Sequence, residues 1–60
     1  MTDRQRQVAQ RLIDEGYPSA DAEAAVEQHA ELIERNKLEP VEYTAGRIWE
    51  AENLQSARPA

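Results

Sequence analysis

The sequence predicts an all-α protein, a small three-helix domain over residues 1–54 followed by a short disordered tail over residues 55–60. Three observations predict this class. Apolar side chains recur at helical spacing in three segments. The breaks between these segments contain Gly16, Pro18 and Pro40, residue types that end or begin helices. No segment alternates polar and apolar residues over the length of a strand.

The first helix has a recognisable signal at each end. Thr2 is followed three residues later by Gln5, which is the spacing of a capping box. Gly16 stands where a left-handed C-terminal cap is expected, and Tyr17 can fold back on the last turn. The apolar face between these ends consists of Val8, Ala9, Leu12 and Ile13.

The second helix is expected to run without a break from a cap at Ser19 or Asp21 to a cap at Asn36. At about 100° per residue, one apolar stripe follows its length. Its members are Ala22, Ala25, Val26, His29, Leu32 and Ile33. An adjoining acidic stripe consists of Glu23, Glu27, Glu31 and Glu34.

The third helix is expected to have Pro40 at its first position, where a missing N–H is harmless. Leu38 and Tyr43 have the spacing of a hydrophobic staple. Gly46 costs about 1 kcal/mol relative to alanine inside a helix, so it either permits the close approach of a neighbour or marks a kink. The apolar face consists of Val41, Ala45, Ile48 and Trp49.

The chain is short for a self-sufficient fold. Sixty residues bury only about 60% of the surface that the unfolded chain exposes. The absence of cysteine rules out disulfides and thiolate metal sites. We therefore expect self-association or a partner to complete the fold. The residues able to build a core are Val8, Leu12, Ile13, Tyr17, Val26, Leu32, Ile33, Leu38, Val41, Tyr43, Ile48, Trp49 and Leu54.

The net charge of −5 is unevenly distributed. Residues 1–13 carry a balance of +2, residues 14–34 a balance of −7, and residues 35–60 a balance of zero. A general nucleic-acid binder would show a basic face, so this distribution argues against that class. The N-terminus lacks the apolar core of a signal peptide and no apolar run is long enough for a membrane span, so we expect a cytoplasmic protein.

The residue inventory argues against an enzyme. The chain has one histidine, no cysteine and two serines, and it has no glycine-rich phosphate loop. His29 has no second metal ligand at the usual helical offsets, whereas a zinc site needs three or four ligands. We therefore expect no catalytic residue, no metal site and no cofactor, and interpret His29 as a partly buried packing residue.

Six residues are candidates for binding a partner protein. Like charges four residues apart on a helix cost about 0.2–0.5 kcal/mol per pair, and a basic surface that met the acidic stripe would offset this cost. The alternative is a solvated face. Trp49 is either a core residue or an exposed anchor, since tryptophan and tyrosine dominate interface hot spots. The six candidates are Glu23, Glu27, Glu31, Glu34, Tyr43 and Trp49.

The sequence resembles two families of small bacterial antitoxins. Residues 15–26, with Gly16-Tyr17-Pro18-Ser19 between two helical segments, resemble the centre of ParD-type antitoxins. That resemblance implies a ribbon-helix-helix fold in which an N-terminal strand reads DNA and the C-terminal region wraps a toxin. Residues 1–7 carry no strand pattern, so the DNA-binding half is not assigned.

The three-helix layout, length and acidity also resemble VbhA, a family of antitoxins that inhibit Fic adenylyltransferases. The inhibitory motif of that family is Ser/Thr-x-x-x-Glu-Gly/Asn. Residues 19–23 match it except that Ala24 follows Glu23, and Glu15-Gly16 match its end with Arg11 at its start. No inhibitory glutamate is therefore assigned. Residues 12–17 and 22–26 resemble the loop and second helix of ubiquitin-associated domains, which we interpret as shared packing logic.

Together these features predict a non-enzymatic, antitoxin-like regulator. Its acidic second helix and aromatic anchors would dock on a partner with a basic surface, such as a toxin enzyme, and inhibit it. One alternative is a dimeric DNA-binding regulator that uses Arg4, Arg6 and Arg11 of the first helix. Another is a structural module whose helices pair with copies of themselves.

Overall fold

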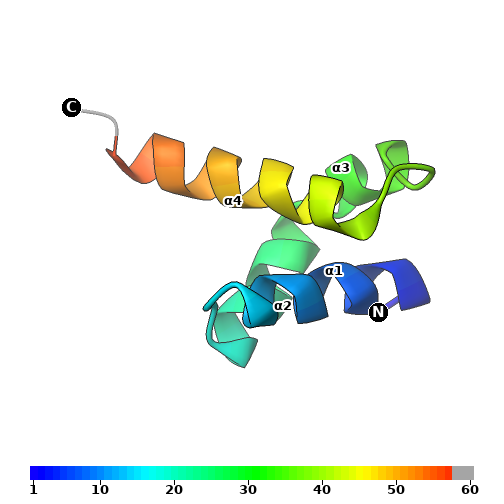
Figure 1. Cartoon of the computed structure of the whole chain (residues 1–60), viewed down its shortest axis with the longest axis horizontal. Coiled ribbons are helices and arrows are strands. Elements are labelled where there is room, and N and C mark those ends of the chain that lie inside the picture. Colours follow the sequence, from blue (N-terminus) through cyan, green and yellow to red (C-terminus); the bar gives the residue numbers. More distant parts are fainter. Residues whose placement is uncertain (58–60) are drawn as a thin grey trace.

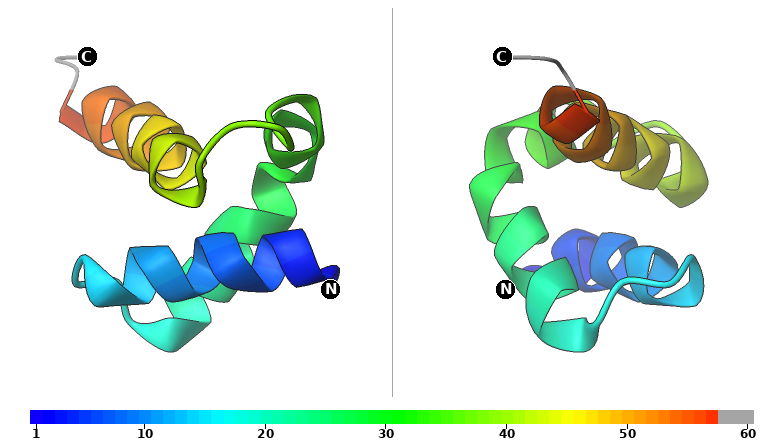
Figure 2. Two further views of the ribbon diagram at one scale, coloured as in Figure 1. Left: turned by 45° about the vertical axis from the view of Figure 1, so that its right-hand side comes forward. Right: turned by 90° about the vertical axis from the view of Figure 1, so that its left-hand side faces the viewer.

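The computed structural model describes the backbone of residues 1–57 and the side chains of residues 1–53, and all regular structure in this part of the chain is helical. The helices are α1 (Asp3–Asp14), α2 (Ser19–Gln28), α3 (Ala30–Arg35) and α4 (Val41–Ala57). α4 lies above α1 and runs in the same general direction, while α2 crosses behind α1 (Figure 1, Figure 2). α1 contacts the other three helices. The predicted all-α class is confirmed.

α1 has the ends that the sequence predicts. The hydroxyl of Thr2 accepts a hydrogen bond from the backbone N–H of Gln5, and the Gln5 side chain accepts one from the N–H of Thr2, both over 3.1 Å. Gly16 has φ +113°. The N–H groups of Gly16 and Tyr17 donate to carbonyl groups of the last turn over 3.0 Å, which is the Schellman arrangement. The capping box and the glycine cap are confirmed.

The predicted second helix is two helices, so the part of the chain that the structure describes has four helices where the sequence predicts three. The break lies at His29, with φ −108° and ψ 27°. Hydrogen bonds still cross it, from His29 N–H to Ala25 O and from Ile33 N–H to His29 O, each 3.0 Å. α2 begins at Ser19 without a side-chain cap, so neither Ser19 nor Asp21 has the predicted capping role. The bend lets both halves pack on the same core.

The core is built from few bulky side chains. Among the described residues, its buried hydrophobic members are Val8, Ala9, Leu12, Ala22, Ala25, Val26, Ile33, Ala45 and Ile48. Four of these are alanines, which let the helices approach closely. Ile13, Tyr17, Leu32 and Val41 pack against them while partly exposed. Thr44 is also fully buried.

Three of the residues that the sequence offers for building a core are exposed, among them Trp49, for which the sequence left open a core position or an exposed anchor. Leu38 is 94% exposed, Tyr43 55% and Trp49 42%. Leu54 is also one of the residues able to build a core, but its side chain lies outside the described residues. The hydrophobic staple predicted between Leu38 and Tyr43 is not formed, because neither side chain is enclosed. Among residues 1–53, whose side chains the structure describes, fewer bulky side chains are therefore enclosed than the sequence offers.

α4 begins one residue later than predicted and ends later. It starts at Val41, and the carbonyl of Pro40 accepts hydrogen bonds from the N–H groups of Tyr43 and Thr44 over 3.0 and 3.3 Å. The helix continues through Gly46 without interruption and reaches Ala57. It thus includes three residues assigned to the tail from the sequence. Residues 58–60 lie outside the described part.

Candidate protein-binding surface

The four candidate glutamates are all exposed, but they no longer form one stripe. Glu23 and Glu27 belong to α2, whereas Glu31 and Glu34 belong to α3, beyond the bend at His29. Glu34 is paired with Lys37 over 3.3 Å, and both side chains are well exposed. These residues form an acidic surface over two helices rather than a single row that a partner could follow.

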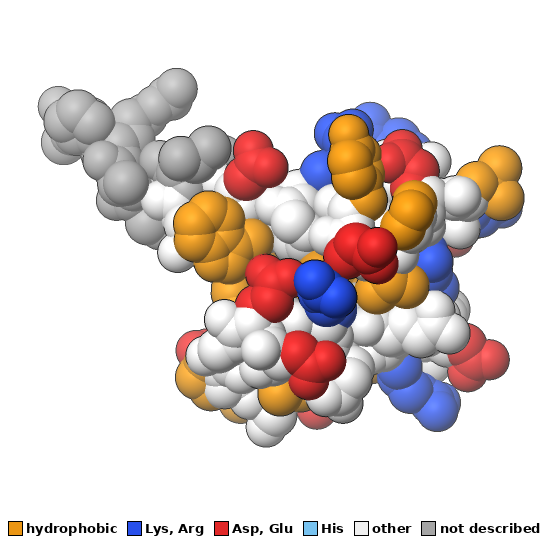
Figure 3. Space-filling view, in the orientation of Figure 1, with side chains coloured by type: hydrophobic (Ala, Val, Ile, Leu, Met, Phe, Trp, Pro, Cys, Tyr) orange, Lys and Arg blue, Asp and Glu red, His pale blue; other side chains and the backbone are white. Residues whose placement is uncertain are grey.

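The two aromatic candidates lie on α4. Trp49 and Tyr43 are six residues apart, so at about 100° per residue they point about 120° apart around the helix. The guanidinium carbon of Arg47 lies 5.1 Å from the centre of the Tyr43 ring. On the face shown in Figure 3, hydrophobic side chains along α4 stand apart, with acidic and basic side chains between them. The acidic residues of α2 and α3 belong to a different part of the fold.

A hollow of about 370 Å³ lies on the outer side of α4, lined by Glu42, Tyr43, Gly46, Arg47 and Glu50. All five residues come from one helix, and the hollow is widely open. It contains an exposed aromatic ring, a glycine, and charges of both signs. Such a surface can receive a side chain of another macromolecule, but it does not enclose a small molecule.

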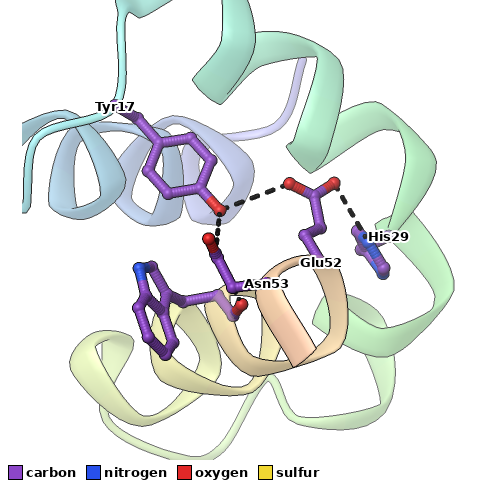
Figure 4. A network of polar contacts seen from close by, with 5 residues as sticks. Tyr17, His29, Glu52 and Asn53 are labelled. Carbon is purple, nitrogen blue, oxygen red and sulfur yellow. Dashed lines mark hydrogen bonds and ion pairs between the residues drawn. The ribbon is translucent and has the colours of Figure 1, made fainter. Parts of the chain in front are cut away.

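A polar network fastens the C-terminal half of α4 to the rest of the fold (Figure 4). The Tyr17 hydroxyl donates to Glu52 Oε1 over 3.3 Å, and Glu52 Oε2 lies 3.4 Å from His29 Nε2. Asn53 Nδ2 donates to the Tyr17 oxygen over 3.2 Å and to the carbonyl of Trp49 over 2.9 Å. The network joins the α1–α2 turn and the bend at His29 to one turn of α4.

Burial raises the pKa of the Tyr17 phenol above its ordinary value. The hydrogen bond from Asn53 acts against this rise, and the negative charge of Glu52 adds to it. A second hollow of about 300 Å³ lies beside these groups, lined also by Gly16, Pro18 and Asp21. The sequence did not predict this network, because Tyr17 is 35 residues away from Glu52 and no local pattern connects them.

The three arginines of the alternative DNA-binding surface have different environments. The Arg4 side chain is partly buried, and its Nη2 donates to the carbonyls of Asn36, over 3.1 Å, and Glu39. Arg11 pairs with Glu15 over 2.9 Å, and this hydrogen bond raises the pKa of Arg11 above its ordinary value. Arg6 is exposed. Arg4 therefore fastens α1 to the α3–α4 connection, and the three arginines do not form one free basic patch.

Within the described residues, no three histidine, aspartate or glutamate side chains come together in a way that could hold a metal ion. None of the helices described is both long and apolar enough to cross a membrane. Comparison with protein-family models, curated protein sequences and solved structures found no match.

Proposed function

We propose that the protein is a non-enzymatic regulator that binds another protein through α4 and inhibits it, as small antitoxins do. One observation supports this most strongly: Trp49 and Tyr43 remain 42% and 55% exposed in a chain that has few bulky side chains to enclose. Large aromatic side chains supply much of the binding energy of protein interfaces when a partner buries them. Trp49 is the proposed anchor, and Tyr43 points in another direction.

The acidic surface has a different role in this proposal. Glu23, Glu27 and Glu31 lie on α2 and α3, whereas the aromatic candidates lie on α4, so the proposal gives the two groups separate roles and does not expect one contact area to include both. The net charge of −5 nevertheless attracts a basic partner over a distance. Electrostatic complementarity of this kind mainly raises the association rate. The proposed partner is a protein with a basic surface, such as a toxin enzyme, located with this chain in the cytoplasm.

The inhibitory part of the proposal rests on the resemblance of residues 15–26 to antitoxins. In the structure these residues form the glycine cap of α1, the turn and most of α2. The turn also provides Tyr17, which holds α4 in place. The antitoxin-like segment thus positions the helix that carries the proposed anchor, although it does not itself provide Trp49.

The experiment starts with the tagged chain in its native host. Proteins that co-purify are identified, purified and tested for binding and for loss of their own activity. W49A should weaken binding about 30-fold or more, the effect of losing a hot spot of about 2 kcal/mol. Q7A, a change at an exposed residue of α1, is the matched control. A W49A protein that folds normally and binds with unchanged affinity would contradict the proposed anchor.

Charge reversal tests the electrostatic part separately. The double variant E27K/E31K should slow association about tenfold at low salt and leave the dissociation rate nearly unchanged. The difference should disappear at about 1 M salt, where the Debye length is about 3 Å. An equal effect at both salt concentrations would mean that the two glutamates contact the partner directly.

A further inference from the structure

Gly46 has no role that the fold of the single chain explains. It lies inside the regular helix α4, and the only glycine with positive φ among the described residues is Gly16. A Cβ atom built at Gly46 would meet nothing within 4 Å in the part of the chain that the structure describes. Alanine favours a helix more than glycine does, and neither backbone strain nor internal packing requires the glycine.

Gly46 lies in the middle of the exposed face of α4. At about 100° per residue, Trp49 lies about 60° from it on one side and Tyr43 about 60° from it on the other. Both aromatic side chains are exposed, whereas Ala45 and Ile48 of the same helix are buried in the core. The two aromatic candidates therefore border one face of the helix, and the glycine separates them.

The hollow beside Gly46 lies between two carboxylates. Glu42 and Glu50 are four residues before and four residues after the glycine, so they are its neighbours along the surface of the helix. Both line the hollow of about 370 Å³. Within the part of the chain that the structure describes, neither takes part in an ion pair or in a side-chain hydrogen bond. Both carboxylates are therefore available to a group from outside.

The charges around the hollow favour a cation. Its lining contains two glutamates and one arginine, Arg47, so the balance is negative. Arg47 itself lies over an aromatic ring of the lining, 5.1 Å from the ring centre. The hydrogen bond to Glu15 raises the pKa of Arg11 on α1, and the charge of Glu42 adds to this rise. Arg11 is paired with Glu15 over 2.9 Å, so its charge is already compensated.

We propose that the hollow receives an arginine side chain of the partner protein, with its guanidinium group between Glu42 and Glu50 and its aliphatic stem over Gly46. This inference rests on the proposed function, because the same partner buries Trp49 at the border of the same face. Arginine is enriched at protein interfaces, and its five N–H donors can serve two carboxylates at once. A Cβ atom at residue 46 would occupy the place of the stem, which explains a glycine in the middle of α4.

The test uses the partner protein purified from the native host, with its affinity measured by titration calorimetry. G46Q fills the hollow with a side chain that favours a helix more than glycine does. It should keep or raise the melting temperature of the chain and yet weaken binding about tenfold or more, because the added side chain excludes the arginine. G46A, which adds one methyl group, should weaken binding about threefold. Stability and affinity thus move in opposite directions.

Charge is tested without a change of shape. E42Q and E50Q each remove one carboxylate of the hollow and should each weaken binding about fivefold. The matched control is D14N, which removes the same charge from an exposed residue of α1 and should change the affinity by less than about twofold.

The arginine is located by replacing surface arginines of the partner with glutamine one at a time. The replacement at the proposed contact should cost about tenfold in affinity with the wild type and almost nothing with G46Q, as coupled residues do in a double-mutant cycle. Effects that all add to that of G46Q would overturn the proposal.

The remaining outcomes separate this inference from the proposed function. If W49A weakens binding while G46Q and E50Q bind as the wild type does, the hollow is not a contact and only this inference fails. Effects of E42Q and E50Q no larger than that of D14N would also overturn it, since net charge alone would then explain them. If no partner binds in a way that depends on Trp49, the proposed function fails and this inference fails with it.

Discussion

Arg4 is the side chain whose removal tests most directly how this small fold is closed. It donates to two carbonyls of the α3–α4 connection, those of Asn36 and Glu39, from a partly buried position at the start of α1. In the variant R4M the aliphatic stem remains while both hydrogen bonds are lost. R6M makes the same chemical change at the exposed Arg6, two residues further along the helix.

The size of the effect can be worked out from these contacts. Hydrogen bonds from a charged donor contribute about 1.5–3 kcal/mol each. The carbonyls are only partly buried, so water replaces part of the loss, and we expect about 2 kcal/mol in total for R4M. A protein of this size has a total stability of about 3–9 kcal/mol. At about 4–8 °C per kcal/mol, the melting temperature should fall by about 8–16 °C.

Urea unfolding followed by far-ultraviolet circular dichroism measures the difference. R4M should shift the midpoint strongly. R4K should retain about half of the stability that R4M loses, because lysine keeps the charge but lacks the planar fork. R6M should change the free energy of unfolding by no more than about 0.5 kcal/mol. Net charge cannot explain a difference between R4M and R6M, because both lose one positive charge. Equal midpoints for these two variants would refute the role assigned to Arg4.

Two further perturbations test the α1–α2 turn and the network. Burial holds the pKa of Tyr17 above its ordinary value of about 10. Just above pH 10 the folded protein therefore keeps a proton that the unfolded chain has lost. The contribution of Tyr17 to the free energy of unfolding should be complete below about pH 10 and decrease as the pH rises through the folded-state pKa. Unfolding measured across this range should show the decrease in Y43F but not in Y17F, and an equal decrease in both would contradict the assignment. G16A should destabilise the protein by about 1–3 kcal/mol, since φ is +113° there, whereas G46A should stabilise it by about 0.5–1 kcal/mol. If G16A and G46A moved the melting temperature in the same direction, the backbone conformation assigned to Gly16 or to Gly46 would be wrong.

The ends of α1 could be predicted because their determinants are local. The capping box involves Thr2 and Gln5, and the glycine cap involves Gly16 and Tyr17, so every interaction spans at most five residues. Side chains at such short separations find each other in nearly any fold that contains the helix. The all-α class followed from the same kind of information, repeated over three segments.

The bend at His29 could not be predicted in this way. Neither glycine nor proline lies near it, and the backbone hydrogen bonds continue across it. The contact that accompanies the bend comes from Glu52, which lies near the end of α4. Helix propensity alone favours a straight helix, and tertiary contacts override that preference here. The predicted acidic stripe is divided between α2 and α3 at this bend.

The buried face of α4 was predicted only in part. Ala45 and Ile48 are buried as expected, but Thr44 takes an inward position while Trp49 lies at the edge. Apolar periodicity ranks tryptophan above threonine for burial. Which face of α4 packs against α1 depends on contacts between residues far apart in the sequence, and apolar periodicity within one helix does not display these contacts.

Three arginines are engaged in contacts within the chain, so they offer less positive charge to a partner than the formal charge of the protein suggests. Arg4 is directed at carbonyls of the chain itself, Arg11 at Glu15, and Arg47 at the ring of Tyr43. Cations held in internal contacts offer fewer hydrogen-bond donors to phosphate groups, so a DNA backbone would gain little from them. The exposed glutamates of α2 and α3 meanwhile leave a negative potential over one side of the molecule. A partner that met that side would need basic groups to complement it. Trp49 lies on α4, so in the proposed function its apolar pocket belongs to a separate contact on a protein partner.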